Sequence, residues 1–124
     1  MTPKREGTGI RSLAYSKFRR GLQDPNTPTS ERLYMTDIDD LEWRKDRGIV
    51  AFIETKHGKA GINTWQARVL RELSELTRRP SYLVAYQTDD PDEENIVSFE
   101  VTNLASNIAV SMTRAEYRSF LRLL

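Results

Sequence analysis

The chain has 124 residues, of which 38% are hydrophobic and 30% are charged, proportions that are typical of one folded domain rather than a disordered segment. It contains no cysteine and a single histidine, which excludes disulfides, thiolate zinc sites, cysteine nucleophiles and clusters of histidine metal ligands. The formal net charge is only +1, so the overall charge by itself points to no class of partner.

No apolar stretch is long enough to span a bilayer, and the first residues, MTPKREGTGIRS, lack the apolar block of a secretion signal. We therefore expect a cytoplasmic protein without a membrane contact. We also expect one domain over residues 1–124, with residues 1–9 flexible, because no repeat or linker interrupts the chain. If a metal binds, oxygen atoms must hold it, which favours Mg²⁺, with Mn²⁺ as a substitute.

Charge is segregated along the sequence. Residues 88–94, TDDPDEE, are strongly acidic, whereas residues 1–20 contain only one acid, Glu6. The basic residues of that N-terminal segment are Lys4, Arg5, Arg11, Lys17, Arg19 and Arg20. Such a segment suits a polyanion such as nucleic acid, and a solvated helix face explains the same pattern equally well.

The first predicted element is a helix, because the apolar residues from Ile10 to Phe18 follow helical spacing. The turn residues of QDPNTPTS at 23–30 end this helix and form a loop. An extended segment from residue 33 to about 43 follows, and a tight turn at 46–48 joins it to a return strand over 49–56. These residues therefore predict a β-hairpin after the first helix.

The second half of the chain contains a helix, two strands and a last helix. The segment HGKAG at 57–61 ends the return strand, and the helix after it ends at RRP, 78–80. Its apolar residues are Ile62, Trp65, Val69, Leu73 and Leu76. The strands SYLVAYQ and IVSFEV come next, separated by the acidic loop. Thr113 and Glu116 then form a capping box that begins the last helix.

This order of elements indicates an α/β fold with a central mixed β-sheet flanked by helices on both faces. A helix between the second and third strands permits a parallel crossover, whereas the hairpin is antiparallel. We expect an α-β-β-α-β core with an extra strand and a C-terminal helix behind it.

The return strand carries a charged pair on an otherwise apolar face. Val50, Phe52, Glu54 and Lys56 have the same parity, and charges on a buried strand are unfavourable unless they are paired, bound to a metal or placed at an open edge. If the turn is centred between residues 46 and 47, the residue numbers of two residues that lie opposite each other on the two strands add up to about 93. Glu54 then faces Asp39, and Lys56 faces Asp37.

These side chains predict a metal site. Carboxylates that share a site repel one another unless a cation joins them, and Lys56 does not offset Asp37, Asp39 and Glu54. A magnesium ion held by Asp39, Glu54, the main-chain carbonyl of Thr55 and waters would neutralise the excess. Asp37 is a further candidate ligand. We expect the cluster to be exposed and to contribute little to folding stability.

An aspartate on one hairpin strand, followed across the turn by an apolar strand that ends in Glu-x-Lys, resembles the PD-(D/E)XK nuclease superfamily. That superfamily includes archaeal Holliday-junction resolvases and small phage-type endonucleases, and the order of elements from Ile10 to Tyr86 also resembles its restriction-endonuclease-like core. The resemblance implies that Asp39 and Glu54 bind magnesium and that Lys56 positions or helps to deprotonate the attacking water.

The same resemblance suggests further site residues. Gln66 on the following helix corresponds to the helix glutamine in the nuclease domains of bacterial recombination helicase-nucleases, although with Asn63 as N-cap it could equally close a capping box. His57 and Lys59, just after the motif, are candidate phosphate contacts, and a solvated histidine is the alternative. Trp43 and Trp65 suit packing in the core or at its rim better than base stacking.

The chain also departs from the superfamily pattern. The proline of the motif name is absent, because Thr36 and Ile38 precede the two aspartates. Many members have a glutamate on the first helix, whereas this chain has no acid between Glu6 and Asp24. The metal shell must then be completed by other groups, or only one metal binds.

The resemblance therefore implies a magnesium-dependent DNA endonuclease, and it leaves open whether the substrate is a junction or other branched DNA, a nicked or linear duplex, or RNA. We expect a homodimer, since a domain of this size needs two copies to cut two strands in concert. Two alternatives are a nucleic-acid-binding module that keeps the fold without cleavage, and an α/β interaction protein whose acids and lysine form an ion-pair network.

Overall fold

The computed structural model of the chain describes residues 3–24, 26, 28, 30–31, 36, 38–58, 64–89 and 95–124, and it describes side chains only from residue 13 onward. The chain forms two compact units, Met1–Asp37 and Ile38–Leu124.

The first unit contains one long helix, α1, which spans Pro3–Gln23. The predicted first helix is therefore confirmed, and it begins earlier than its apolar residues indicate. Proline suits the first turn of a helix, where its missing N–H has no helical acceptor. The helix ends where the turn residues predict, with the N–H of Asp24 donating to the Arg20 carbonyl at 2.9 Å.

The second unit begins with the predicted hairpin, whose strands are β1, Asp40–Arg44, and β2, Gly48–His57. Asp40 pairs with Ile53, so the partner numbers sum to 93 as predicted, and a β-bulge after Glu42 changes the register by one. Gly48 has φ +78°, a conformation that favours glycine at the end of this turn. The prediction that extended structure forms a strand from residue 33 is wrong for residues 36, 38 and 39, which lie outside β1.

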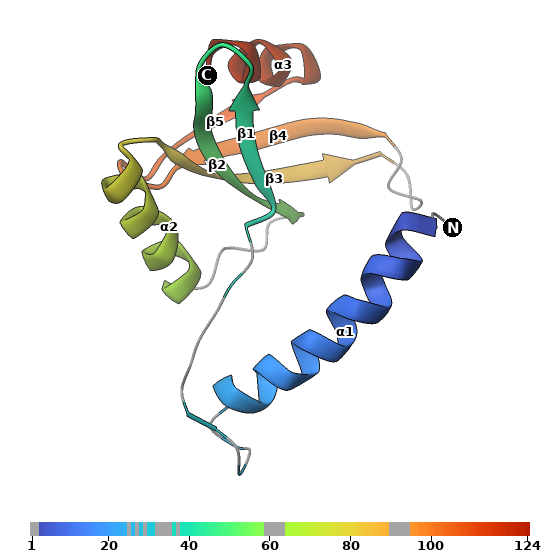
Figure 1. The fold of residues 1–124 in the computed structure, drawn as a ribbon. Helices are drawn as coiled ribbons and strands as arrows, with labels where there is room; N and C mark the ends of the chain where they lie inside the picture. Colours follow the sequence, from blue (N-terminus) through green and yellow to red (C-terminus); the bar gives the residue numbers. More distant parts are fainter. Residues whose placement is uncertain are drawn as a thin grey trace. The chain divides into compact units, whose positions relative to one another are not determined.

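The remaining elements complete a five-stranded sheet in the order β1-β2-β3-β4-β5 (Figure 1). They are α2, Thr64–Thr77; β3, Ser81–Thr88; β4, Ile96–Asn103; β5, Ile108–Met112; and α3, Arg114–Leu123. β3 runs parallel to β2, with α2 in the connection, and the other neighbours are antiparallel. The predicted α/β class with a mixed sheet is confirmed, and β5 is a strand that the sequence analysis did not predict.

Each face of the sheet has its own apolar layer. On one face Phe52 packs with Leu70 of α2 and with Leu104. On the other face Ile53, Val84 and Val101 pack against residues of α3. Because successive residues of a strand point to opposite faces, the neighbours Phe52 and Ile53 anchor the two layers. α2 and α3 thus cover opposite faces of the sheet, as predicted (Figure 1).

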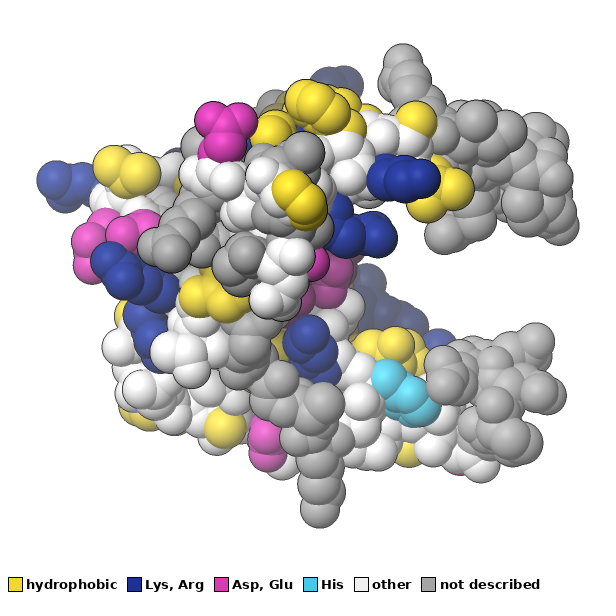
Figure 2. Space-filling model, turned by 90° about the horizontal axis from the view of Figure 1, so that it is seen from below, with side chains coloured by type: hydrophobic (Ala, Val, Ile, Leu, Met, Phe, Trp, Pro, Cys, Tyr) yellow, Lys and Arg dark blue, Asp and Glu magenta, His cyan; other side chains and the backbone are white. Residues whose placement is uncertain are grey.

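Helix α2 packs only partly through the predicted stripe, since Leu73 contacts the core but Leu70, which lies outside that stripe, is buried there. Ala67 and Leu70 are its buried residues, whereas Leu76 is 85% exposed. Trp43 and Trp65 are 59% and 43% exposed, so neither lies in the core. Hydrophobic side chains are in fact exposed between charged ones on the face drawn in Figure 2.

Helix α3 follows the prediction closely. The Thr113 hydroxyl accepts from the N–H of Glu116 at 3.1 Å, and the Glu116 carboxylate accepts from the N–H of Thr113 at 2.8 Å. Tyr117 stacks on Phe99 of β4, with ring centroids 4.2 Å apart. The capping box and the aromatic face together fix where α3 begins and which side it turns to the sheet.

In the part of the chain that the structure describes, no helix has the length and apolar character needed to cross a membrane.

Candidate functional site

The charged pair of β2 lies at the end of the strand's buried stretch. Glu54 is only 6% exposed, and it shares a face with Phe52, the face that α2 covers. Lys56 is two residues further along, with its Nζ 3.8 Å from Oε2 of Glu54 and its side chain 30% exposed. The expectation of an exposed cluster is therefore wrong for Glu54, because the apolar layer continues beneath its carboxylate.

Asp39 lies one residue before β1, beside Glu54 in the register of the hairpin. Its Oδ2 accepts a hydrogen bond from the main-chain N–H of Thr55 at 2.9 Å and another from the Thr55 hydroxyl at 3.0 Å. The carboxylate thus binds the N–H of a β2 residue that lies just past the paired part of β1. These two bonds hold the Asp39 carboxylate against β2, where it reaches the Glu54 site.

Electrostatics at Glu54 reflect this crowding. Burial raises the pKa of its carboxyl above the ordinary value, and the negative charge of Asp39 raises it further. Lys56 and a main-chain hydrogen bond from Asp39 act to lower that pKa, without cancelling the increase. Two carboxylates and one ammonium group therefore leave an excess of negative charge at a partly buried place.

The oxygen atoms at this place suit a hard divalent cation. The N–H of Phe52 donates to the Pro80 carbonyl, so the main-chain groups of Phe52 point toward β3. Main-chain groups of successive residues in a strand point to alternate neighbours. Thr55 is three residues after Phe52, so its main-chain groups point toward β1. The Thr55 carbonyl therefore lies on the side of β2 where Asp39 binds. Two carboxylates and one carbonyl are the donors that Mg²⁺ prefers, and waters would have to complete the shell.

Among the described residues, no group of three or more His, Asp or Glu side chains could hold a metal ion. The candidate site therefore depends on two carboxylates and on main-chain oxygen. Asp37, the further candidate ligand, lies outside the described residues.

Gln66 and His57 are both close to this part of the sheet in sequence and have other contacts. Gln66 is half-buried on α2, and its predicted N-cap, Asn63, lies outside the described residues. His57 ends β2, stacks on Tyr86 with ring centroids 5.2 Å apart, and makes a hydrogen bond with the Thr88 hydroxyl at 3.2 Å. His57 therefore contacts two residues of β3 and is not simply solvated.

The predicted phosphate-binding residues are described in part. Lys17 and Arg20 are exposed on α1, and Arg19 is half-buried there. The side chains of Lys4, Arg5 and Arg11 and the whole of Lys59 lie outside the description. α1 belongs to the first unit of the chain, and the hairpin belongs to the second.

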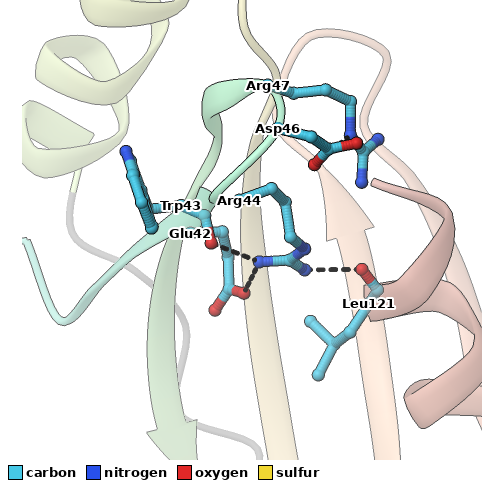
Figure 3. Close-up of polar contacts among 6 residues, drawn as sticks. All are labelled: Glu42, Trp43, Arg44, Asp46, Arg47 and Leu121. Atoms are coloured by element: carbon cyan, nitrogen blue, oxygen red, sulfur yellow. Dashed lines mark hydrogen bonds and ion pairs between the residues drawn. The ribbon is translucent and has the colours of Figure 1, made fainter.

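The opposite face of the hairpin holds a second polar cluster, which the sequence analysis did not predict. Arg44 donates to the carboxylate of Glu42 at 3.0 Å and to the carbonyl of Leu121, in the last turn of α3, at 2.6 Å (Figure 3). A cation at the carboxyl end of a helix also interacts favourably with the helix dipole. The cluster therefore attaches the hairpin to α3.

Acidic groups of this second cluster influence one another. Burial raises the pKa of Tyr117 to about 12, and the charges of Glu42 and Asp40 contribute to the increase. Burial also raises the pKa of Asp40, with contributions from Glu42 and Asp39. The alternation of acids in DLEWR was the only sequence signal for this cluster, because α3 is far away along the chain.

No protein-family model matches the chain, and comparison with curated proteins and with solved structures also produced no match.

Proposed function

We propose that the chain is a magnesium-dependent DNA endonuclease of the PD-(D/E)XK type. The observation that carries this proposal is the convergence of Asp39 and Glu54, beside Lys56, at the end of the apolar strand β2. Two carboxylates with only one ammonium group leave negative charge that a divalent cation would neutralise.

Each residue has a definite task in such a reaction. Asp39, Glu54 and the Thr55 carbonyl would hold the cation, which supplies positive charge for the non-bridging phosphate oxygens and lowers the pKa of a nearby water. Thr55 keeps the Asp39 carboxylate oriented through two hydrogen bonds. Lys56 orients the attacking water with its ammonium group and adds positive charge as the phosphate becomes more negative.

The nucleic-acid contact in this proposal comes from the exposed basic residues of α1, Lys17 and Arg20. Replacing both by glutamine should weaken binding to all DNA sequences, because phosphate contacts carry no sequence information. The slope of log affinity against log salt should then fall by about two, roughly one unit for each lost contact. An unchanged slope would show that these residues are only a solvated helix face.

A second function is favoured by a specific observation. Thr55 donates two hydrogen bonds to Asp39, and Glu54 forms an ion pair with Lys56, so each carboxylate has a partner within the protein. The same groups can therefore form a purely structural network in an α/β interaction protein. The two functions differ in whether a divalent cation binds at this place.

Incubation of the full chain with branched, nicked and linear DNA, with Mg²⁺ or with EDTA, tests the proposal. Cleavage that requires Mg²⁺ and disappears in the Lys56→Ala variant supports the nuclease. If no substrate is cut and Mg²⁺ does not raise the melting temperature, the structural network is the better account. DNA binding without cleavage would identify a non-catalytic nucleic-acid-binding module.

A further inference from the structure

The outer strand β5 is chemically unlike the rest of this chain. Residues 101–113, VTNLASNIAVSMT, contain no charged side chain, although 30% of the whole chain is charged. β5 lies within this stretch and is the last strand of the sheet among the described residues. Its outward side therefore presents main-chain N–H and C=O groups that no described strand pairs with.

Folded proteins usually protect such an edge with lysine, proline, a bulge or an inward-pointing charge. The other outer strand, β1, has two of these features, since it carries charged residues and a bulge. β5, with the sequence IAVSM, has none of them. The strand is thus suited to pairing with another strand that is also free of charge.

The side chains of β5 make one of its faces apolar. Val110 pairs with Val101, a residue of the core layer beneath α3, so Ile108, Val110 and Met112 point to the α3 side of the sheet. Ile108 and Val110 are nevertheless 64% and 50% exposed. Together with Tyr82, Val101 and Phe120 they line an open groove of about 260 Å³ beside α3.

We infer that a second copy of this chain pairs with β5, strand to strand and antiparallel, so that two sheets join into one. A two-fold axis at Val110 places Val110 opposite itself and Ile108 opposite Met112 of the other copy. Every pair on the α3 side is then apolar, and Ala109 faces Ser111 on the other side. The absence of charge matters here, because a strand paired with itself would bring any charge close to its own copy.

The same pairing also fills the groove. Met112 of the second copy lies opposite Ile108, which is one of the groove-lining residues. Directly opposite side chains in an antiparallel pair are about 4.5–5.5 Å apart at their Cβ atoms, which is within contact range for these residues. The inference concerns only the second unit of the chain and does not depend on nuclease activity.

A cysteine cross-link tests both the pairing and its register, because the natural chain has no cysteine. Val110→Cys places two thiols across the proposed axis, at a Cα separation that suits a disulfide. Val97→Cys is the matched control, since Val97 is also partly exposed, at 43%, but lies on the inner strand β4. The oligomeric state of the wild-type chain is measured in parallel by light scattering.

We expect a wild-type dimer and, at a chain concentration of 100 μM, a disulfide that forms roughly tenfold faster in Val110→Cys than in Val97→Cys, because paired thiols meet at an effective concentration of about millimolar. A monomeric wild-type chain at 100 μM would overturn the inference, as would occupation of the edge by the chain's own N-terminal unit, which also gives a monomer. A dimer in which the two cysteine variants cross-link at equal rates would place the interface elsewhere and overturn it too.

Discussion

The two outer strands of the sheet differ in how their polar groups are used. β1 carries Asp40, Glu42 and Arg44, and the hydrogen bond from Arg44 to the Leu121 carbonyl attaches it to α3. β5 carries no charge and leaves apolar side chains exposed. Because the two edges lie at opposite ends of the sheet, the charged groups of β1 do not interfere with strand pairing at β5.

The charged end is also where the buried carboxylate lies. Glu54 belongs to β2, which pairs directly with β1, and its neighbour Asp39 immediately precedes β1. Four variants separate the roles of the two ends.

The largest expected effect concerns the charged end. Lys56→Ala and Glu54→Gln should each lower Mg²⁺-dependent DNA cleavage by about 10²–10⁴-fold, because one removes the group that orients the water and the other removes a ligand charge. Glu42→Gln is the control, since Glu42 lies on the opposite face, paired with Arg44. Initial rates on the best DNA substrate measure the effect, and equal losses in all three variants would refute the site.

The next effect concerns the uncharged end. Val110→Lys should weaken self-association by about a hundredfold or more, because like charges across an interface repel by several kcal/mol. Sedimentation at a series of concentrations measures the dissociation constant, and circular dichroism checks that the variant is folded. Val97→Lys should remain a dimer, and if it dissociates equally the effect is not specific to β5.

A smaller effect concerns the attachment of β1 to α3. Arg44→Ala should lower the free energy of unfolding by about 1.5–3 kcal/mol, because it removes charge-assisted hydrogen bonds of a half-buried side chain. The neighbouring Arg47 forms an exposed ion pair with Asp46, so Arg47→Ala should cost only about 0.2–1 kcal/mol. Urea unfolding of both variants gives the comparison, and similar values would mean that the bond to Leu121 contributes little (Figure 3).

The smallest effect is a pH dependence at Glu54, whose pKa burial raises above its ordinary value of 4.5. A raised folded pKa means that this group's contribution to stability is fully present below pH 4.5 and is lost as pH rises through the raised pKa. Since glutamine resembles the protonated carboxyl, Glu54→Gln should melt higher than the wild type at pH 8 and equally near pH 4.5. Thermal melting in EDTA measures this, and a less stable variant at pH 8 would favour the structural ion-pair network.

Local patterns predicted much of this fold. The capping box at Thr113 and the turn before Gly48 are short-range signals. The pairing of Asp40 with Ile53 followed from the position of that turn alone. The juxtaposition of Asp39 and Glu54 could be predicted for the same reason, since two strands joined by a short turn have few registers open to them.

Other features could not be predicted because they depend on contacts far apart in the sequence. The bond from Arg44 to Leu121 joins residues 77 positions apart. The burial of Glu54 depends on where α2 packs, and the predicted stripe of α2 included Leu73 but missed Leu70, which packs on Phe52 and Leu104, far away along the chain. β5 has only five residues, two of which are small, so its alternating Ile108, Val110 and Met112 were a weak signal.

The strand order sets a length scale for any dimer joined at β5. In a sheet joined at β5, seven interstrand spacings separate β2 of one copy from β2 of the other. At about 4.8 Å each, the two Glu54 residues would be about 34 Å apart along the joined sheet, and sheet twist shortens the direct path. That span is about one helical turn of duplex DNA, which is 34–36 Å. If the proposed nuclease and the proposed pairing at β5 both hold, the two sites would reach phosphates on one side of a duplex, about ten base pairs apart.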